Sequence, residues 1–326
     1  MTLNGVPLTR NRTVDAAPAR QRFVWIATTS YSGATLLAVL LGSHPDIATI
    51  GEMNGIIPSE DPERYICSCG ERIRACGFWN DVAVALRRLD IPFDVADFGL
   101  TFGVGGPRLM RRLRLNSLGH AVLDRARDEL FLLWPPERAA QRRLAARNRA
   151  FIAVALELTG ASVFVDTSKD VLRIDALDRF TDLDVSAIHL TRDVRGVVAS
   201  RLSRGVPISA ADGARQWARH HARVERRLAR LPQDRQMRVR YEDLCRRPAD
   251  TLAAIYRFCG VSQPDAGRPL DGVQHVVGNP MRLARLEDIR LDERWRSLPA
   301  DQLAAIDRVA ADARHRFGYD DRGAAA

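Results

Sequence analysis

Lysine is nearly absent from this sequence. Every one of its 49 basic residues is an arginine except Lys169. An arginine guanidinium is planar and effectively always protonated, whereas a lysine ammonium is a compact charge that can release a proton. The lone lysine therefore indicates chemistry that a guanidinium cannot perform, unless it is a surface residue that persisted by chance. Basic residues exceed the 40 acidic ones, and the net charge of +9 suits anionic ligands.

Long hydrophobic runs are also missing. The longest, around residues 36–41, is far too short to cross a bilayer. Residues 1–22 contain no continuous apolar stretch, so we expect a flexible polar tail rather than a secretory signal. The five cysteines are sparse and odd in number, which fits a reducing cytoplasm better than a disulfide scaffold. The sequence predicts a cytoplasmic protein without stable membrane insertion.

The chain is organised around residues 23–52. A short apolar run at 23–26 predicts a buried strand, small and polar residues follow at 28–33, and residues 34–41 predict a helix. The first N–H groups of a helix lack intrahelical partners and carry positive potential, so this loop predicts an anion site. It would be formed by Thr29, Ser30, Tyr31, Ser32, Gly33, Ala34, Thr35 and Leu36. The alternative is an ordinary tight turn between strand and helix.

This loop lacks the lysine of nucleotide triphosphatases. Their motif ends in Gly-Lys-Ser/Thr, whereas Gly33 is followed here by Ala34 and Thr35. The sequence therefore predicts an anion site without the equipment for ATP hydrolysis.

The remaining pattern predicts an α/β fold of the P-loop-like kind, a mainly parallel sheet with helices on both faces. We expect one domain over residues 23–326, with a mostly helical insertion or lid at about 53–150, broken at Pro135-Pro136. Further strands are predicted at 163–165, 185–190 and 237–240, and helices at 171–180, 194–203, 215–231, 248–259 and 301–317. Ligands bind such sheets beyond the carboxyl ends of the strands. Residues 29–35, Lys169, Arg192 and Tyr241 should therefore meet at one edge.

Four separated motifs resemble those of sulfotransferases that use 3′-phosphoadenosine 5′-phosphosulfate (PAPS), of a bacterial type similar to the carbohydrate and tyrosylprotein branch. Residues 32–37 read Ser-Gly-x-Thr-Leu-Leu and are followed by His44-Pro45 and Gly51-Glu52, like the family's 5′-phosphosulfate loop. HLTRDVRGVVASRL at 189–202 resembles its 3′-phosphate motif. VRYEDL at 239–244 and GNPMR at 278–282 also recur in the family.

The resemblance implies a role for each motif. Residues 29–36 would bind the phosphosulfate, Arg192 and Ser200 the 3′-phosphate, and Tyr241 the adenine, with Arg282 among the cofactor-binding residues. Alternatively, Arg192 forms a local ion pair with Asp193, and Tyr241 belongs to the core.

Two residues are the predicted catalytic pair. Lys169 would stabilise charge on the leaving phosphate as the bond to sulfur breaks. Glu52 would be the general base for the acceptor hydroxyl, unless it only orients the loop or caps a helix, and His275 is the second candidate. Many family members have Lys or Arg at the position of Tyr31. The missing cation would be replaced by Lys169 alone or by Arg64, Arg108 or Arg111.

The segment CSCGERIRACGFW, with Cys67, Cys69 and Cys76, could be a structural zinc knuckle. No fourth ligand is evident nearby, so we expect free thiols and no metal. His44 is expected to fix the exit of the first helix, and His189 to be a satisfied core histidine. The arginine-rich helices at 138–149 and 215–230 are expected to be solvated faces.

The sequence therefore predicts an enzyme that transfers a sulfuryl group from PAPS to a hydroxyl of a small-molecule, lipid or carbohydrate acceptor, giving PAP without a metal. A P-loop phosphotransferase is the rival enzyme, and it would need the lysine that the loop lacks. A nonenzymatic basic module that binds nucleic acid would explain the charge but not Lys169. We expect no nucleic-acid partner; the acceptor and the oligomeric state stay open.

Overall fold

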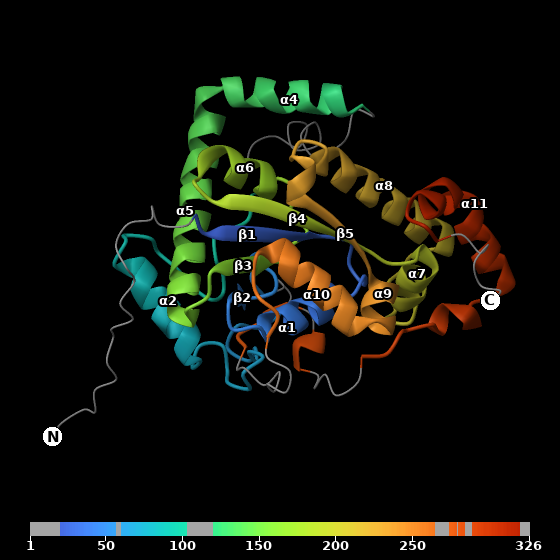
Figure 1. The fold of residues 1–326 in the computed structure, drawn as a ribbon, viewed down its shortest axis with the longest axis horizontal. Helices are drawn as coiled ribbons and strands as arrows, with labels where there is room; N and C mark the ends of the chain where they lie inside the picture. The colour runs from blue at the N-terminus through green and yellow to red at the C-terminus, as the bar shows by residue number, and fades with distance from the viewer. Residues whose placement is uncertain are drawn as a thin grey trace.

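The computed structural model describes residues 20–56, 60–102, 120–264, 274–278, 280–283 and 289–319. Within them, five strands form one sheet with parallel pairing throughout, in the order β2-β3-β1-β4-β5. The strands are β1 Arg22–Ala27, β2 Ile47–Thr49, β3 Val163–Asp166, β4 Asp184–Thr191 and β5 Gln236–Arg240. The predicted α/β class with a parallel sheet is confirmed (Figure 1).

Helices cover both faces of this sheet (Figure 1). They are α1 Ala34–Gly42, α2 Gly77–Arg87, α4 Ala121–Leu133, α5 Pro135–Thr159, α6 Arg173–Phe180, α7 Val194–Leu202, α8 Ala210–Leu228, α9 Tyr241–Arg246, α10 Pro248–Cys259 and α11 Ala300–Arg316. Short 3₁₀ turns lie at η1 Gln233–Arg235, η2 Pro280–Leu283 and η3 Arg294–Ser297. None of these helices is long and apolar enough to span a bilayer.

Successive residues of each strand point to opposite faces, which builds two cores. Phe23 and Trp25 of β1 pack with side chains of α2, α5 and α6. Val24 and Ile26 pack on the other face with α1, α9 and α10. A third apolar cluster joins α7, α8 and α11 beyond the sheet, around Trp217. The strands are apolar on both faces because helices bury both of them.

Most predicted element ends agree with the structure within two residues, but two elements differ. Helix α8 begins at Ala210, five residues before the predicted start, because the Ser209 side chain accepts a hydrogen bond from the Asp212 amide and caps the helix. It also ends earlier, at Leu228. The second difference is the short helix α9, which begins at Tyr241 and was not among the predicted helices.

The described residues of the segment at 53–150 include α2, α4 and most of α5. The predicted break at Pro135-Pro136 is confirmed, since α4 ends at Leu133 and α5 begins at Pro135. Helix α5 buries Phe151 and Ile152 against the sheet. The predicted tail lies outside the described residues except for its last three positions, and the single domain at 23–326 stays a prediction.

Candidate functional site

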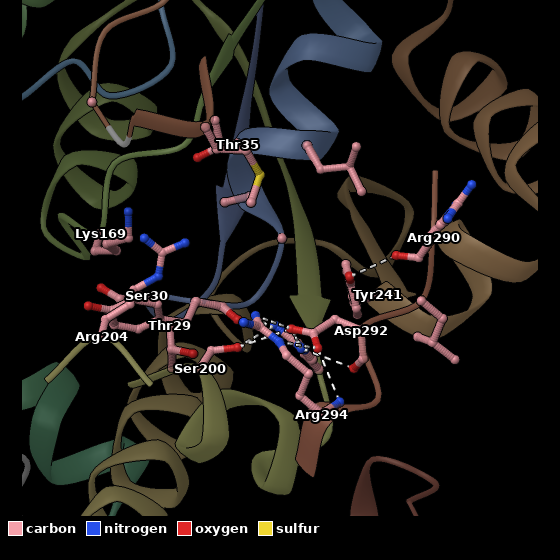
Figure 2. A pocket seen from close by; sticks show the side chains of 18 of the residues that line it. Thr29, Ser30, Thr35, Lys169, Ser200, Arg204, Tyr241, Arg290, Asp292 and Arg294 are labelled. Carbon is pink, nitrogen blue, oxygen red and sulfur yellow. Dashed lines mark hydrogen bonds and ion pairs between the residues drawn. The ribbon is translucent and has the colours of Figure 1, made fainter. Parts of the chain in front are cut away.

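A cavity of about 710 Å³ lies beyond the carboxyl ends of the strands. Its walls come from the β1–α1 loop, the segments after β2 and β3, α7, α9 and residues 290–294. In Figure 2, Lys169 and Arg204 lie toward one end, while Tyr241, Arg290, Asp292 and Arg294 lie toward the other. The lining contains five basic side chains (Lys169, Arg192, Arg204, Arg290 and Arg294) and two acidic ones, Glu52 and Asp292. This excess of positive charge suits an anionic ligand.

The β1–α1 loop presents an open helix N-terminus to this cavity. Gly33 precedes α1 with φ of +87°, and no side chain caps the helix. A Cβ atom on Gly33 would lie 2.4 Å from the Tyr241 ring, so only glycine allows this close approach. Tyr31 also has a positive φ, of +66°. The uncapped N–H groups of α1 and the absence of an acidic residue in its first turn give the loop the properties of an anion site.

Arg192 is nearly buried at the end of β4 and is held from several sides. Its guanidinium donates hydrogen bonds to the Tyr31 carbonyl at 2.8 Å and to Ser200 Oγ at 3.3 Å. It also forms an ion pair with Asp292 at 3.0 Å and lies 4.5 Å from the centre of the Tyr241 ring. The predicted Arg192–Ser200 pair is therefore brought together, with Ser200 in the second turn of α7. Asp292 is a third partner that the sequence did not indicate.

Asp193 does not pair with Arg192. Its carboxylate caps α7 and pairs with Arg195, so the alternative of a local ion pair applies to that neighbouring arginine. Arg294 donates to both carboxylate oxygens of Asp292 at 2.8 Å. Hydrogen bonds from Arg294 and then from Arg192 hold the pKa of Asp292 well below its usual range, so it is ionised at neutral pH.

Lys169 and Glu52 form an ion pair with each other across the opposite end of the cavity. Both side chains are 27% exposed. Glu52 follows Gly51, where a Cβ atom would lie 2.5 Å from the Val277 carbonyl. The close passage of residues 276–277 thus requires the glycine before Glu52. The two predicted catalytic residues meet although 116 positions lie between them in sequence.

A buried ion pair supports this end of the cavity. Arg173 in α6 is fully buried and donates to Asp166 Oδ2 at 2.7 Å. The same carboxylate accepts from the Ser168 amide at 2.9 Å and the Met53 amide at 3.2 Å. Because Ser168 precedes Lys169 and Met53 follows Glu52, one buried pair fixes the backbone of both. Sequence reasoning missed Asp166 and Arg173, although an aspartate at the end of a buried strand was a visible signal.

Twelve of the predicted site residues line the cavity: Thr29, Ser30, Tyr31, Gly33, Ala34, Thr35, Leu36, Glu52, Lys169, Arg192, Ser200 and Tyr241. Two do not. Ser32 is buried and its hydroxyl lies 2.6 Å from Thr29 Oγ1, so it braces the loop. Arg282 is nearly buried and donates to the carbonyls of Ile66 and Gly278, so it supports the wall instead of facing the cavity.

The arginines expected to replace the cation missing at Tyr31 are not the ones that line the cavity. Arg64 is exposed and is not among the lining residues, and Arg108 and Arg111 lie outside the described residues. Arg204, in the turn after α7, lies 5.8 Å from the centre of the Tyr31 ring. It lines the cavity beside the ring of Tyr31, where the expected cation is missing.

The predicted histidines take structural positions. His44 accepts from the Asp46 amide at 3.0 Å and its other ring nitrogen lies 2.8 Å from the Ser262 carbonyl, at the exit of α1. His189 lies 2.8 Å from His221, and burial lowers its pKa to about 3. His275 faces the cysteine cluster and is not among the lining residues of the cavity. This placement leaves Glu52 as the candidate base.

A second cavity of about 430 Å³ shares Thr29, Ser30, Tyr31 and Lys169 with the first. Side chains of α7 and α8 form its far wall, including Trp217 and His220. Lys169 and the loop thus separate two spaces and are accessible from both.

Comparison with known proteins shows which family this site resembles. Residues 119–265, somewhat less than half of the chain, match the model of the sulfotransferase family. Over this segment the chain is similar to sulfotransferases. The resemblance inferred from the motifs is therefore confirmed there. The matched segment includes Lys169, Arg192, Ser200 and Tyr241 and leaves out the β1–α1 loop and Glu52.

Two human proteins are similar to part of the chain. Carbohydrate sulfotransferase 5 is 26% identical over 167 residues, which cover 42% of this chain and 40% of that protein. Carbohydrate sulfotransferase 6 is 26% identical over 166 residues, or 42% of each chain. The chain therefore spans less than half the length of these relatives. A solved sulfotransferase domain from the Synechococcus PCC 7002 olefin synthase aligns with 95% of this chain and 98% of its own, at 21% identity and a TM-score of 0.49.

Proposed function

We propose that the protein is an enzyme that moves a sulfuryl group from PAPS to an acceptor hydroxyl and releases PAP. The observation that carries the proposal is the convergence of three sites on one cavity. They are the open N-terminus of α1, the Arg192–Ser200 pair and the Lys169–Glu52 pair. The donor is anionic at two separated positions, and this cavity offers positive potential at both of its ends.

The β1–α1 loop is proposed to bind the 5′-phosphosulfate. The uncapped N–H groups of α1 would donate to its oxygens, and the hydroxyl of Thr35 lines the cavity beside them. Thr29, Ser30, Tyr31, Gly33, Ala34 and Leu36 would contribute through backbone and packing. Arg204 would add a positive charge over Tyr31, where the loop has no cation of its own.

The Arg192 end is proposed to bind the 3′-phosphate. A guanidinium donates two parallel hydrogen bonds to a phosphate, and Ser200 would add a third. The Tyr241 ring lies against both Gly33 and Arg192, a position from which it would contact the adenine. Arg294 lines the same end and is paired with Asp292. It would move together with that carboxylate when a phosphate displaces it.

Lys169 and Glu52 are proposed to perform the transfer. Glu52 would accept the proton of the acceptor hydroxyl as its oxygen bonds to sulfur. The bond from sulfur to the bridging oxygen breaks, and its electron pair stays on the phosphate of PAP. The Lys169 ammonium would stabilise that developing charge. Their ion pair holds the two side chains next to each other, as this division of roles requires.

The acceptor is proposed to be a small molecule, a lipid or a carbohydrate. The names of the two human relatives favour a carbohydrate, over the part of the chain that they match. An acceptor must reach Glu52, so we place it on the side of the cavity formed by Glu52, Gly278 and Met281. We also propose a cytoplasmic protein, since all five cysteines are free thiols. A lid role for residues 53–150 stays a prediction, because none of the described residues of that segment lines the cavity.

Calorimetric titration with PAP, ADP and ATP in the absence of magnesium tests the proposal. We expect PAP to bind much more tightly than ADP, because ADP lacks the 3′-phosphate that Arg192 and Ser200 would bind. Transfer of label from ³⁵S-PAPS to a panel of sugars, phenols and alcohols then tests the reaction. Equal affinity for PAP and ADP would overturn the proposal and favour a phosphotransferase. Salt-dependent binding of DNA without a nucleotide preference would favour a nucleic-acid module.

A further inference from the structure

Four potential metal ligands meet at a place outside the cavity lining. Cys67, Cys69 and Cys76 come from one short segment, and His275 comes from a segment almost 200 residues later. Their ligand atoms all lie within 4.8 Å of one another. Cys69 Sγ lies 3.6 Å from Cys76 Sγ, and His275 Nδ1 lies 3.2 Å from Cys76 Sγ and 3.8 Å from Cys67 Sγ.

These separations match the edges of a zinc tetrahedron. With bonds of about 2.3 Å to sulfur and about 2.0 Å to nitrogen, a tetrahedral zinc site has S···S edges of about 3.8 Å and S···N edges of about 3.5 Å. We propose that Cys67, Cys69, Cys76 and His275 bind one zinc ion as a structural site. Three thiolates and one imidazole are a donor set that zinc prefers.

The cysteine segment is folded as a metal-binding turn. Ile66 and Arg72 pair as an antiparallel bridge, and the Cys67 amide donates to the Glu71 carbonyl at 2.9 Å. Gly70 turns the chain with φ of +94°. Cys76 is the N-cap of α2, where the helix dipole favours the negative charge of a thiolate.

The histidine is also fixed before any metal binds. The Ser68 hydroxyl, from the cysteine turn, donates to the Gln274 carbonyl at 2.6 Å and accepts from the Val276 amide at 2.7 Å. The backbone on both sides of His275 is thus tied to the turn that carries Cys67 and Cys69. The imidazole stacks on Phe78 with ring centres 4.5 Å apart and planes 4° from parallel.

The burial of the cluster indicates a structural metal. Cys67 and Cys76 are buried, and Cys69 and His275 are half-buried. Four protein ligands complete a tetrahedron and leave no position for substrate or water. The ion would join the turn at 66–76 to residues 274–278, whose end, Gly278, lines the cavity beside Glu52. A zinc ion here would position that wall without contacting the ligand.

Metal analysis of the full-length protein, purified under reducing conditions from a zinc-supplemented culture, tests the proposal. We expect about one zinc per chain by mass spectrometry of the elements. Replacement by Co²⁺ should give the intense visible absorption of a tetrahedral cobalt–thiolate site. Neither measurement depends on PAPS, so their outcome is separate from that of the proposed function.

Matched variants locate the ion. Cys69→Ala and His275→Ala should lose the zinc and lower the melting temperature, whereas His275→Cys should keep it as a Cys₄ site. Cys259→Ala is the control, because Cys259 is a buried thiol outside the cluster and its loss should leave the zinc content unchanged. If a cluster variant does not fold, the stoichiometry and the cobalt spectrum of the unmodified protein decide alone.

Three results would overturn the proposal. They are wild-type protein with well under one metal per chain and no cobalt spectrum, a Cys69–Cys76 disulfide found in the reduced preparation, or iron in place of zinc. Zinc that persists in both Cys69→Ala and His275→Ala would show that any bound ion lies elsewhere.

Discussion

Both ends of the cavity contain a cation paired with a carboxylate, but the two cations differ in how firmly the protein holds them. At each end a cation is paired with a carboxylate of the protein, Lys169 with Glu52 and Arg192 with Asp292. Arg192 is only 6% exposed and also bonds Tyr31 and Ser200. Lys169 is 27% exposed, and Glu52 is its one hydrogen-bond partner among the described residues. One cation is held by several groups of the fold, and the other by a single carboxylate.

This difference fits a division between binding and chemistry. A fixed guanidinium suits a phosphate that stays in place throughout a reaction, since little conformational entropy is lost when it binds. An ammonium with a single protein partner keeps donors available for a group whose charge changes during a reaction. The carboxylates differ as well. Glu52 lies shortly after strand β2, whereas Asp292 lies in the irregular segment before η3.

The largest effect should come from removing the buried support of the Lys169 end. Arg173→Met leaves the buried Asp166 carboxylate without its cation, and we expect the free energy of unfolding to fall by about 3–5 kcal/mol. Arg179→Ala, in the same helix but in an exposed ion pair with Glu129, is the control and should change little. Urea unfolding measures both. If the Arg173 variant unfolds like the control, the buried pair does not hold this end of the cavity together.

Removing Lys169 should affect the rate more than binding. Lys169→Ala is expected to lower kcat by about 10²–10³, as for loss of one transition-state donor, and to leave the PAP affinity close to that of the wild type. Lys169→Arg, which keeps a charge near Glu52, should recover part of the rate. Steady-state kinetics and calorimetry separate the two quantities. Equal losses of rate and PAP affinity would show that Lys169 is a binding residue like Arg192.

Removing Arg192 should have the opposite signature. Arg192→Ala is expected to weaken PAP binding by about 10- to 150-fold, the range for a hydrogen-bonded charged partner, and to leave ADP binding nearly unchanged. Ser200→Ala should cause a smaller loss of PAP affinity, because a neutral hydroxyl contributes less than a guanidinium. Parallel titrations with the two nucleotides are the measurement. An equal loss for PAP and ADP would place the adenine or the 5′ end, not the 3′-phosphate, at Arg192.

The parallel sheet, and the convergence of the loops at the carboxyl ends of its strands, could be predicted from the pattern of apolar residues in the sequence. Each strand is a short apolar run, and parallel strands end at the same edge, so Lys169, Arg192 and Tyr241 had to come together. The early start of α8 was visible as Ser209 with Asp212 three residues later, a capping pattern that was overlooked. The roles of these residues in binding and catalysis stay predictions.

Other contacts could not be predicted because they join segments without a shared pattern. His275 completes the cysteine cluster from 199 positions beyond Cys76, and nothing in the spacing of the cysteines indicates it. Asp292 pairs with Arg192 from an irregular segment, where neither helical nor strand periodicity fixes the direction of a side chain. Arg204 lies in an exposed turn, as do many arginines of this chain.

The smallest expected effect comes from changing Asp292. It also tests most directly whether the two cation–carboxylate pairs of the cavity differ in function. Its carboxylate lies 3.0 Å from Arg192 and 3.4 Å from Ser200 Oγ, where a bound phosphate would need the same donors. Asp292→Asn should therefore tighten PAP binding by several-fold, since a like charge no longer opposes the phosphate, and the gain should shrink at high salt. Because Arg294 and Arg192 keep the pKa of Asp292 well below its usual range, this carboxylate stays ionised between pH 6 and 8. The gain should therefore rise with pH only as the 3′-phosphate of PAP, whose second pKa is about 6, gains its second charge.

Glu293→Gln, which removes the neighbouring carboxylate paired with Arg296, is the matched control and should leave PAP affinity unchanged. Titration of both variants with PAP and ADP is the measurement. If Asp292→Asn weakens PAP binding instead, the carboxylate serves to hold Arg192 and Arg294 in place, and the two ends of the cavity are equally dependent on their acidic partners. A gain for PAP alone would mean that Asp292 occupies the phosphate position until the ligand displaces it. Glu52 would have no such role, because as the proposed base it would remain beside the reacting atoms.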